Sequence, residues 1–389
     1  MYNIKTLNEI SPVYAQVLDM QDYSVSSDCA DPDAIIVRSA DMHSTPKNNK
    51  LLAIGRAGAG YNNIPVIEMG KQGVVVFNAP GANANAVKEL ALAALLLASR
   101  DIVGGIEWCK TLVGKGADVP KLVEKGKNQF VGPELKGKTL GVIGLGGVGG
   151  LVANAGHALD MNVIGYDPYI SVDHAWKLSR SIRHAKSQEE LLADSDYVSV
   201  HVPLMDKTRG SLNAGFIAGM KKGAVLLNLS RGELAVNADV LSALQSGQLR
   251  RYVTDFPCEE MINQPGVIAI PHLGASTPES EDNCVRMVAD QIDKYLRTGS
   301  IINSVNYPTC ELPMPHNYRV VLLHANIPNM IGPYASMVAS YGINIDNMVN
   351  KSKGEFAYTA LDLDDMPPAE LLEKLTSPEG SYGMRVIHA

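Results

Sequence analysis

Three polar side chains in the second half of the sequence have the chemistry needed to oxidise a secondary alcohol by hydride transfer. His272, in "PHLGAST", carries an imidazole that titrates in the range required to remove the hydroxyl proton. Glu260, in "TDFPCEE", could orient that ring and favour its charged form. Arg231, in "NLSRGE", could bind the carboxylate and carbonyl oxygen of a 2-hydroxy or 2-keto acid through paired donors. Taken singly, each also fits an ordinary loop histidine, a solvated carboxylate or a surface ion-pair partner.

Short apolar runs predict the elements that position these side chains. Six such runs occur in order: "TLGVIG", "NVIGYD", "YVSVHV", "AVLLNL", "YVTDF" and "VIAIP". Helix-length sequence separates them, a pattern typical of a doubly wound parallel sheet, which binds ligands at the carboxyl ends of its strands. We therefore expect residues 96–282 to form a Rossmann-like dinucleotide-binding domain.

A glycine-rich segment, "TLGVIGLGGVGG" at residues 139–150, matches the pattern G-x-G-x-x-G in the right surroundings. Gly144, Gly146 and Gly149 follow a strand-like run and precede a helical one, and the next strand-like run ends at Asp167. The loop can bring the pyrophosphate of a dinucleotide to the start of a helix. Asp167 would accept hydrogen bonds from the adenosine ribose and repel a 2′-phosphate, which favours NAD over NADP. A purely structural glycine turn is the alternative.

Two further domains are expected. Runs such as "AIIVRSA" and "VVVFNAP" predict a first α/β domain, flavodoxin-like or Rossmann-like, over residues 1–95 and 283–303. The proline-rich residues 304–317 predict a linker. Residues 318–389 follow the order strand, helix, strand, strand, helix, strand, which predicts a small ferredoxin-like α+β domain.

Composition excludes several classes of partner and site. A net charge of −7 and a pI of about 5.7 provide no basic field for nucleic acid. The longest apolar run, "LALAALLLAS", is too short for a membrane span, and the N-terminus does not resemble a signal peptide, so we expect a cytoplasmic protein without membrane contact. Five scattered cysteines argue against a disulfide framework and a zinc site, and no metal is expected.

The order and spacing of these motifs resemble the D-2-hydroxyacid dehydrogenase family. "NLSRGE", Asp255 with Glu260, and "PHLGAST" are similar to the family's arginine, aspartate-to-glutamate and histidine motifs, and "HVPL" with Thr208 and Asn213 agrees. The resemblance implies that Arg231, Glu260 and His272 are catalytic and that NAD is the cofactor. The residues that it implies in cofactor binding are Gly144, Gly146, Gly147, Val148, Gly149, Asp167, His201, Pro203, Thr208, Ser230, Asp255 and Gly274. Met261 stands where the family usually has proline.

The first domain also resembles the family's substrate-side segments, in "IIVRSA", "RAGAGYNNIP" and "NAPGANANAVKEL". The substrate contacts implied by this resemblance are Arg38, Ser39, Gly58, Ala59, Gly60 and Asn83, with Asn63 shaping the loop. A close strand-to-helix turn is an equally good explanation for each glycine alone. Lys88 stands where the family more often has a small residue, and nothing in the sequence gives it a role beyond a solvated helix charge.

The C-terminal segment resembles an ACT regulatory domain. It implies serine as an effector, with contacts from His324, Asn326 and Asn344, although Asn329 replaces a common glycine and a domain that only mediates dimer contacts is the alternative. The whole resemblance implies oxidation of 3-phospho-D-glycerate to 3-phosphohydroxypyruvate, the first committed step towards serine, by a homodimer or homotetramer. The alternatives are a glyoxylate, hydroxypyruvate or erythronate-4-phosphate reductase, and a non-enzymatic NAD-sensing, corepressor-like module.

Overall fold

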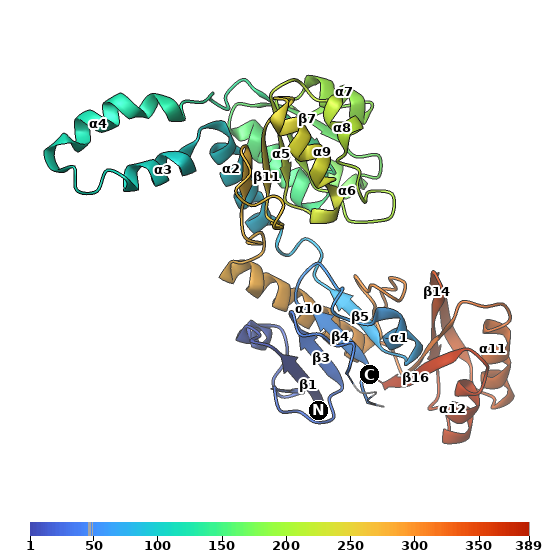
Figure 1. Cartoon of the computed structure of the whole chain (residues 1–389). Coiled ribbons are helices and arrows are strands. Elements are labelled where there is room, and N and C mark those ends of the chain that lie inside the picture. Colours follow the sequence, from blue (N-terminus) through green and yellow to red (C-terminus); the bar gives the residue numbers. More distant parts are fainter. Residues whose placement is uncertain (46–47, 49, 389) are drawn as a thin grey trace. The chain divides into compact units, whose positions relative to one another are not determined.

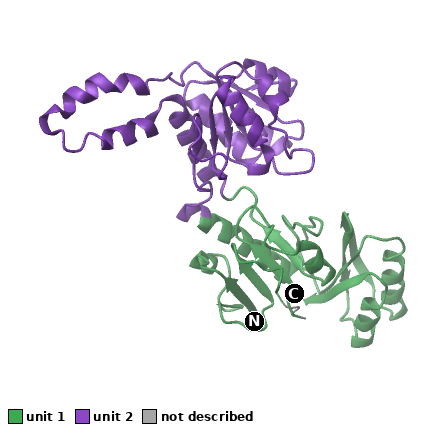
Figure 2. Ribbon diagram, in the orientation of Figure 1, with its two compact units in different colours: residues 1–82, 281–389 green, residues 83–280 purple. Residues whose placement is uncertain are grey.

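The computed structural model describes residues 1–45, 48 and 50–388, and the chain divides into two compact units (Figure 2). Residues 1–82 and 281–389 form one unit, and residues 83–280 form the other, which we call the NAD-type unit. The boundary expected at residue 95 falls inside helix α2 (Ala84–Ser99). This helix groups with the NAD-type unit because its buried alanines and Leu95 share a core with Leu140 and Val152.

The first unit begins with a parallel sheet in the order β2-β1-β3-β4-β5, the flavodoxin-like order. Its strands are β1 (Tyr2–Leu7), β2 (Tyr23–Ser26), β3 (Ala34–Val37), β4 (Ala53–Arg56) and β5 (Val75–Asn78). A 3-10 turn η1 (Pro12–Gln16) and helix α1 (Val66–Lys71) connect strands, and the long helix α10 (Pro278–Thr298) packs its apolar stripe on the sheet. Every residue of β3 and β5 is buried, as expected for strands covered on both faces.

The NAD-type unit contains a seven-stranded parallel sheet in the order β12-β11-β10-β9-β6-β7-β8. Its strands are β6 (Thr139–Ile143), β7 (Asn162–Tyr166), β8 (Arg183–His184), β9 (Tyr197–Val200), β10 (Ala224–Asn228), β11 (Leu249–Thr254) and β12 (Val267–Ala269). The chain order reverses between β6 and β9, which is the topological switch point of a Rossmann sheet. Six strands were expected, and the additional one, β8, has only two residues, both exposed, so it leaves no apolar run in the sequence.

Helices cover this sheet, and one pair extends away from it. The covering helices are α2, α5 (Gly147–Ala158), α6 (Val172–Trp176), α7 (Gln188–Asp194), α8 (Ala214–Ala218) and α9 (Asn237–Gln245), with a 3-10 turn η4 (Gly232–Leu234). The pair, which we call the arm, spans residues 102–130 and projects from the unit (Figure 1). Its elements are α3 (Ile102–Lys110), η2 (Gly116–Asp118), α4 (Val119–Gly126) and η3 (Lys127–Phe130).

The C-terminal part of the first unit is a four-stranded antiparallel sheet in the order β14-β15-β13-β16. Its elements are β13 (Tyr318–Ala325), α11 (Ile331–Ser340), β14 (Ile345–Lys353), β15 (Phe356–Leu363), α12 (Ala369–Thr376) and β16 (Ser381–His388). This is the expected βαββαβ order, and both helices pack on one face of the sheet. The other face, with Leu323, Phe356 and Tyr358, shares a core with α10 and β5.

Side chains of the C-terminal sheet bind the last carbonyl groups of α10, which have no partners within the helix. Arg385 donates to the carbonyl oxygens of Tyr295 at 2.5 Å and Leu296 at 3.0 Å. Arg319 donates to the carbonyl oxygen of Thr298 at 2.7 Å, and the Tyr358 hydroxyl donates to that of Gly299 at 2.7 Å. Guanidinium groups also suit the negative end of the helix dipole.

The segment expected to be a linker, residues 304–317, is packed in its first half. The Asn306 side chain bonds both backbone groups of the edge strand, accepting from Val76 N at 3.0 Å and donating to Val74 O at 2.9 Å. The Tyr307 hydroxyl donates to Gly70 O at 2.7 Å, and Cys310 is buried. The prolines therefore mark an ordered connection that joins the two sheets of this unit.

A buried ion pair secures this arrangement and gives a first prediction. Arg319 is fully buried, binds Asp362 at 2.5 and 2.9 Å, and also donates to two carbonyl oxygens. We expect Arg319→Met to destabilise the C-terminal sheet by about 3–5 kcal/mol, because Asp362 would lose its counter-ion and the carbonyl groups their donors. The measurement is the opening free energy of β13 and β15 amides by native-state hydrogen exchange. The exposed pair Lys374–Glu370 supplies the control, since Lys374→Met should leave this value unchanged. An Arg319→Met protein as stable as the original would contradict the interpretation.

Candidate active site

The surroundings of the three glycines in the glycine loop differ, and each favours glycine for its own reason. Gly144 has φ +86°, and a Cβ there would lie 2.7 Å from the carbonyl oxygen of His201. A Cβ on Gly149 would lie 1.8 Å from the carbonyl oxygen of Gly144, so only glycine lets α5 approach the loop. A Cβ on Gly146 would meet no atom within 4 Å, which leaves open space at the N-cap residue that precedes α5. This space, and a helix start without a side-chain cap, fit a pyrophosphate.

Asp167 is held beside this loop. Its carboxylate accepts hydrogen bonds from the backbone N–H groups of Leu145 and Tyr169, each at 2.8 Å. Carboxylate oxygens have further acceptor capacity, so the group can also accept from ribose hydroxyls. Its position at the end of β7 next to the glycine loop fits the role expected from the sequence.

The loops after β9 and β10 are tied to each other at the same edge of the sheet. The Ser230 hydroxyl donates to Val200 O at 2.7 Å, and the Thr208 hydroxyl donates to Pro203 O at 2.7 Å. His201 contacts Ser199 through its Nε2 atom at 2.8 Å, and burial lowers the pKa of His201 to about 4, so its ring is neutral near neutral pH. These loops carry the cofactor residues predicted there and place Arg231 one residue after Ser230.

Asp255, at the end of β11, is the electrostatic centre of the candidate site. Burial raises the pKa of its carboxyl group, and the nearby side chains of His272 and Arg231 partly oppose that rise. Its Oδ1 atom is buried and, among the residues that the structure describes, has no hydrogen-bond partner. A buried acceptor in this condition fits an amide or hydroxyl donor from a bound cofactor.

The expected pair of His272 and Glu260 is not joined by a hydrogen bond within the described part of the chain. The ring of His272 lies 4.5 Å from that of Phe256, centroid to centroid. Glu260 instead accepts from Asn237 Nδ2 at 3.4 Å. Met261, which replaces the family's usual proline, is buried and anchors the turn after Cys258 in the apolar core.

The residues predicted to contact substrate lie mainly in the first unit. Arg38 forms an ion pair with Glu281 at 2.5 Å, and Ser39 N donates to Asn8 Oδ1 at 3.0 Å. Gly58 and Ala59 are bonded to the end of β5 through Ala79 N at 2.9 Å and Asn78 Nδ2 at 2.7 Å, with Gly60 following. Asn63 shapes the neighbouring turn by donating to Ala40 O at 2.8 Å, and Asn83, in the other unit, precedes α2.

Sequence reasoning missed one cation in this group. Arg56 ends β4 directly beside the end of β3, because Val37 and Arg56 are paired in register. Its guanidinium group lies against Gly58, where an added Cβ would be 1.6 Å from Nη1. The signal was present in "LLAIGRAGAG", where an arginine closes an apolar run at the edge that binds ligands.

The three residues expected to bind an effector are engaged within the fold. His324 is buried, with Nδ1 2.8 Å from Ala325 O and Nε2 2.9 Å from Thr359 Oγ1, and burial lowers its pKa. Asn326 donates to Gly354 O at 3.0 Å. Asn344 donates to Asp346 Oδ1 at 2.8 Å, and no hydrogen bond among the described residues joins these three side chains.

Among the described residues, no group of three His, Cys, Asp or Glu side chains is placed to hold a metal ion. None of the helices in this part of the chain is long and apolar enough to cross a bilayer.

The glycine loop yields a paired prediction. We expect Gly146→Ala to leave the melting temperature unchanged but to weaken NADH binding by roughly tenfold or more, because its methyl group would occupy the space meant for the pyrophosphate. Gly149→Ala should lower the melting temperature as well, because α5 must move. Thermal unfolding and fluorescence titration with NADH provide the two measurements. Unaltered NADH affinity in Gly146→Ala would show that the loop does not receive the cofactor.

Comparison with known proteins agrees with this geometry. The D-isomer specific 2-hydroxyacid dehydrogenase, NAD binding domain, matches residues 82–274. The chain is 34% identical over 368 residues to a D-3-phosphoglycerate dehydrogenase of Methanocaldococcus jannaschii, with 92% of this chain and 66% of that protein covered. It is 31% identical to one from Haemophilus influenzae, with 87% of this chain and 82% of that protein covered. The chain spans less than two thirds of several relatives, including 52% of the Bacillus subtilis D-3-phosphoglycerate dehydrogenase.

Solved structures agree as well. The NAD⁺-bound 3-phosphoglycerate dehydrogenase of Entamoeba histolytica has a TM-score of 0.61 at 25% identity, over 78% of this chain and 98% of that one. The D-mandelate dehydrogenase of Rhodotorula graminis has a TM-score of 0.67 at 22% identity, over 80% of this chain and 99% of that one, which shows the shared fold. The NAD-type unit is therefore an NAD-binding domain of Rossmann type, and the chain belongs to the D-isomer specific 2-hydroxyacid dehydrogenase family.

Proposed function

We propose that this protein oxidises 3-phospho-D-glycerate to 3-phosphohydroxypyruvate, reversibly and with NAD, in the serine pathway. The observation that carries the proposal is the grouping of Arg231 and His272 around the buried Asp255, at the edge of the sheet that also holds the glycine loop. The relatives named D-3-phosphoglycerate dehydrogenase support the choice of substrate.

Each side chain has a distinct task in this proposal. The Arg231 guanidinium binds the substrate carboxylate and carbonyl oxygen, and a ring nitrogen of His272 accepts the proton of the C2 hydroxyl during oxidation. NAD supplies the acceptor for the hydride that leaves C2. In the reverse direction the His272 imidazolium returns the proton to the alcohol oxygen. Glu260 stabilises that imidazolium only after its side chain leaves Asn237.

Cations in the first unit support a phosphorylated substrate. Arg38 and Arg56 follow or end the neighbouring strands β3 and β4, at the carboxyl edge where parallel sheets bind ligands. Guanidinium groups suit phosphate oxygens because their donors are paired and permanently charged. Arg38 is held by Glu281 and is about two-fifths exposed, so an entering phosphate has to compete with that ion pair.

The proposal predicts that a substitution of His272 lowers turnover without weakening the binding of NADH. His272→Asn should lower kcat by about 10²- to 10⁴-fold, because the proton acceptor is lost, while the Kd for NADH stays within about twofold. His157→Asn, at an exposed position near the far end of α5, is the matched control and should change neither value. Equal losses of turnover and of NADH affinity would contradict the role given to His272.

The same assay decides among substrates. With NADH, 3-phosphohydroxypyruvate should give a higher kcat/KM than hydroxypyruvate or glyoxylate. A preference for either smaller acid would favour a reductase of the same family. NADH binding without turnover of any of them would favour an NAD-sensing module.

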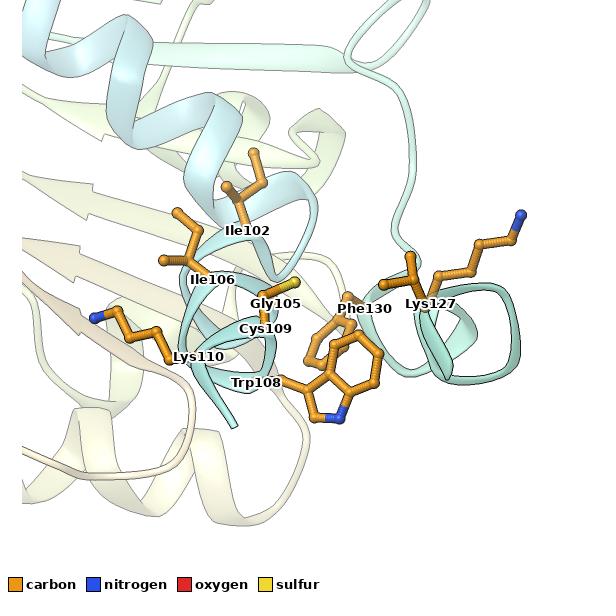
Figure 3. A pocket seen from close by; sticks show the side chains of 9 residues that line it. Ile102, Gly105, Ile106, Trp108, Cys109, Lys110, Lys127 and Phe130 are labelled. Carbon is orange, nitrogen blue, oxygen red and sulfur yellow. The ribbon is translucent and has the colours of Figure 1, made fainter. Parts of the chain in front are cut away.

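We also propose that the protein forms a homo-oligomer through the arm. No residue of α3, η2, α4 or η3 is buried, although isolated short helices need a packed apolar face for stability. Ile102, Ile106, Trp108 and Phe130 help to line a hollow of about 630 Å³. Figure 3 shows the rings of Trp108 and Phe130 close together. The arm has five lysines against three acidic residues, whereas the whole chain carries −7, so a second copy offers the opposite charge.

The arm proposal predicts a change in mass. Ile106→Glu places a charge in the hollow and should convert a dimer or tetramer into smaller species in sedimentation velocity. Val172→Glu, at an exposed position on α6, is the control and should leave the mass unchanged. A monomeric unmodified protein, or an Ile106→Glu protein of unaltered mass, would contradict assembly through the arm.

A further inference from the structure

Lys88 lies on the inner side of the first turns of α2. It follows Ala84 by four residues and precedes Ala91 by three, which places it next to a helix face whose alanines are at most 5% exposed. Its own side chain is only 21% exposed. The ammonium group donates to Asn85 Oδ1 at 2.7 Å, and because Asn85 lies one turn earlier, Nζ is directed towards the start of the helix.

The start of α2 lies beside the loop that carries His272. Val87 precedes Lys88, and a Cβ added to Gly274 would meet Val87 Cγ2 at 3.3 Å and Asp255 Oδ2 at 3.3 Å. Gly274 is two residues from His272, and Asp255 is the carboxylate whose pKa both His272 and Arg231 act to lower, against the rise caused by burial. Lys88 is therefore one residue from a packing contact with the candidate catalytic loop, within the same unit.

The partners of the Lys88 ammonium group are an amide and one exposed carboxylate. Its nearest polar partner is a neutral amide, and the only carboxylate near it in the described residues, that of Glu89, is 3.5 Å away and 62% exposed. Asn83 caps α2 without a side-chain hydrogen bond, so the helix start adds positive potential at the same place. A lysine directed towards a helix N-terminus adds to the positive potential there, and both attract an anion that binds at this place.

We propose that Lys88 is a specificity residue that binds the phosphate group of the substrate. The proposal rests on the function proposed above and gives that reaction a cation from the NAD-type unit itself. It gives a reason for the long cationic side chain at this position of α2.

The test compares substrates with and without phosphate in the full-length protein. For Lys88→Met we expect a rise of roughly 10- to 100-fold in the KM for 3-phosphohydroxypyruvate, because one charge-assisted hydrogen bond to the phosphate is lost. The KM for hydroxypyruvate should not change. Lys88→Arg should restore most of the phosphate preference. Lys221→Met is the matched control and should change neither KM. It removes another partly buried lysine, which precedes the amino end of β10 and therefore lies away from the carboxyl edge of the sheet.

A binding measurement separates this proposal from the proposed function. With NADH present, 3-phospho-D-glycerate and D-glycerate form complexes that cannot react, so their Kd values are measurable without turnover. Lys88→Met should weaken only the phosphorylated ligand. If the unmodified protein proved inactive, the function would fail while this selective loss would still support the role of Lys88. Equal weakening of both ligands, or of neither, would overturn that role.

Discussion

The close approach of α5 to the loop after β6 is the constraint on which the candidate site depends. The Gly144 carbonyl oxygen occupies the place of a side chain at Gly149, so the helix can start directly above the sheet at its topological switch point. This contact brings the unbonded N–H groups of the first helical turn to the carboxyl ends of β6 and β9. Asp167 and the loops after β9 and β10 are then bonded to the same edge.

Long-range order in the fold was predictable from the sequence where apolar runs were long and buried. All six expected strands of the NAD-type unit are present. Five of them contain at least three buried residues, and β12 has none. The seventh, β8, was missed because two exposed residues carry no periodicity. The packed state of residues 304–310 was also unpredictable, since it depends on Asn306 and Tyr307 finding backbone partners more than 200 residues away. Prolines indicate where a helix or strand ends, and they do not indicate whether the chain is anchored.

The positions of the candidate site residues in the fold were more predictable than their hydrogen bonds. Residue types at strand ends indicated Arg231, Asp255 and His272, because topology alone brings strand ends together. The hydrogen bonds of Glu260 and Asn237 depend on side-chain torsions in a loop, which the sequence does not encode by any simple period. His324 shows a different limit of sequence patterns. The sequence predicted it as an effector contact, but both ring nitrogens have partners inside the fold, which the sequence does not reveal.

The manner in which α10 ends has a consequence for the evolution of this chain. Arg319, Tyr358 and Arg385 all come from the C-terminal sheet, and together they donate hydrogen bonds to carbonyl groups at the end of α10 and at Gly299 directly after it. A gene that lost its last segment would therefore lose the termination of a helix belonging to another layer, and not merely an appendage. Recombination at residue 317 is costly for the same reason, and exchange of this segment between relatives should succeed only when the donor carries equivalent guanidinium and phenol groups.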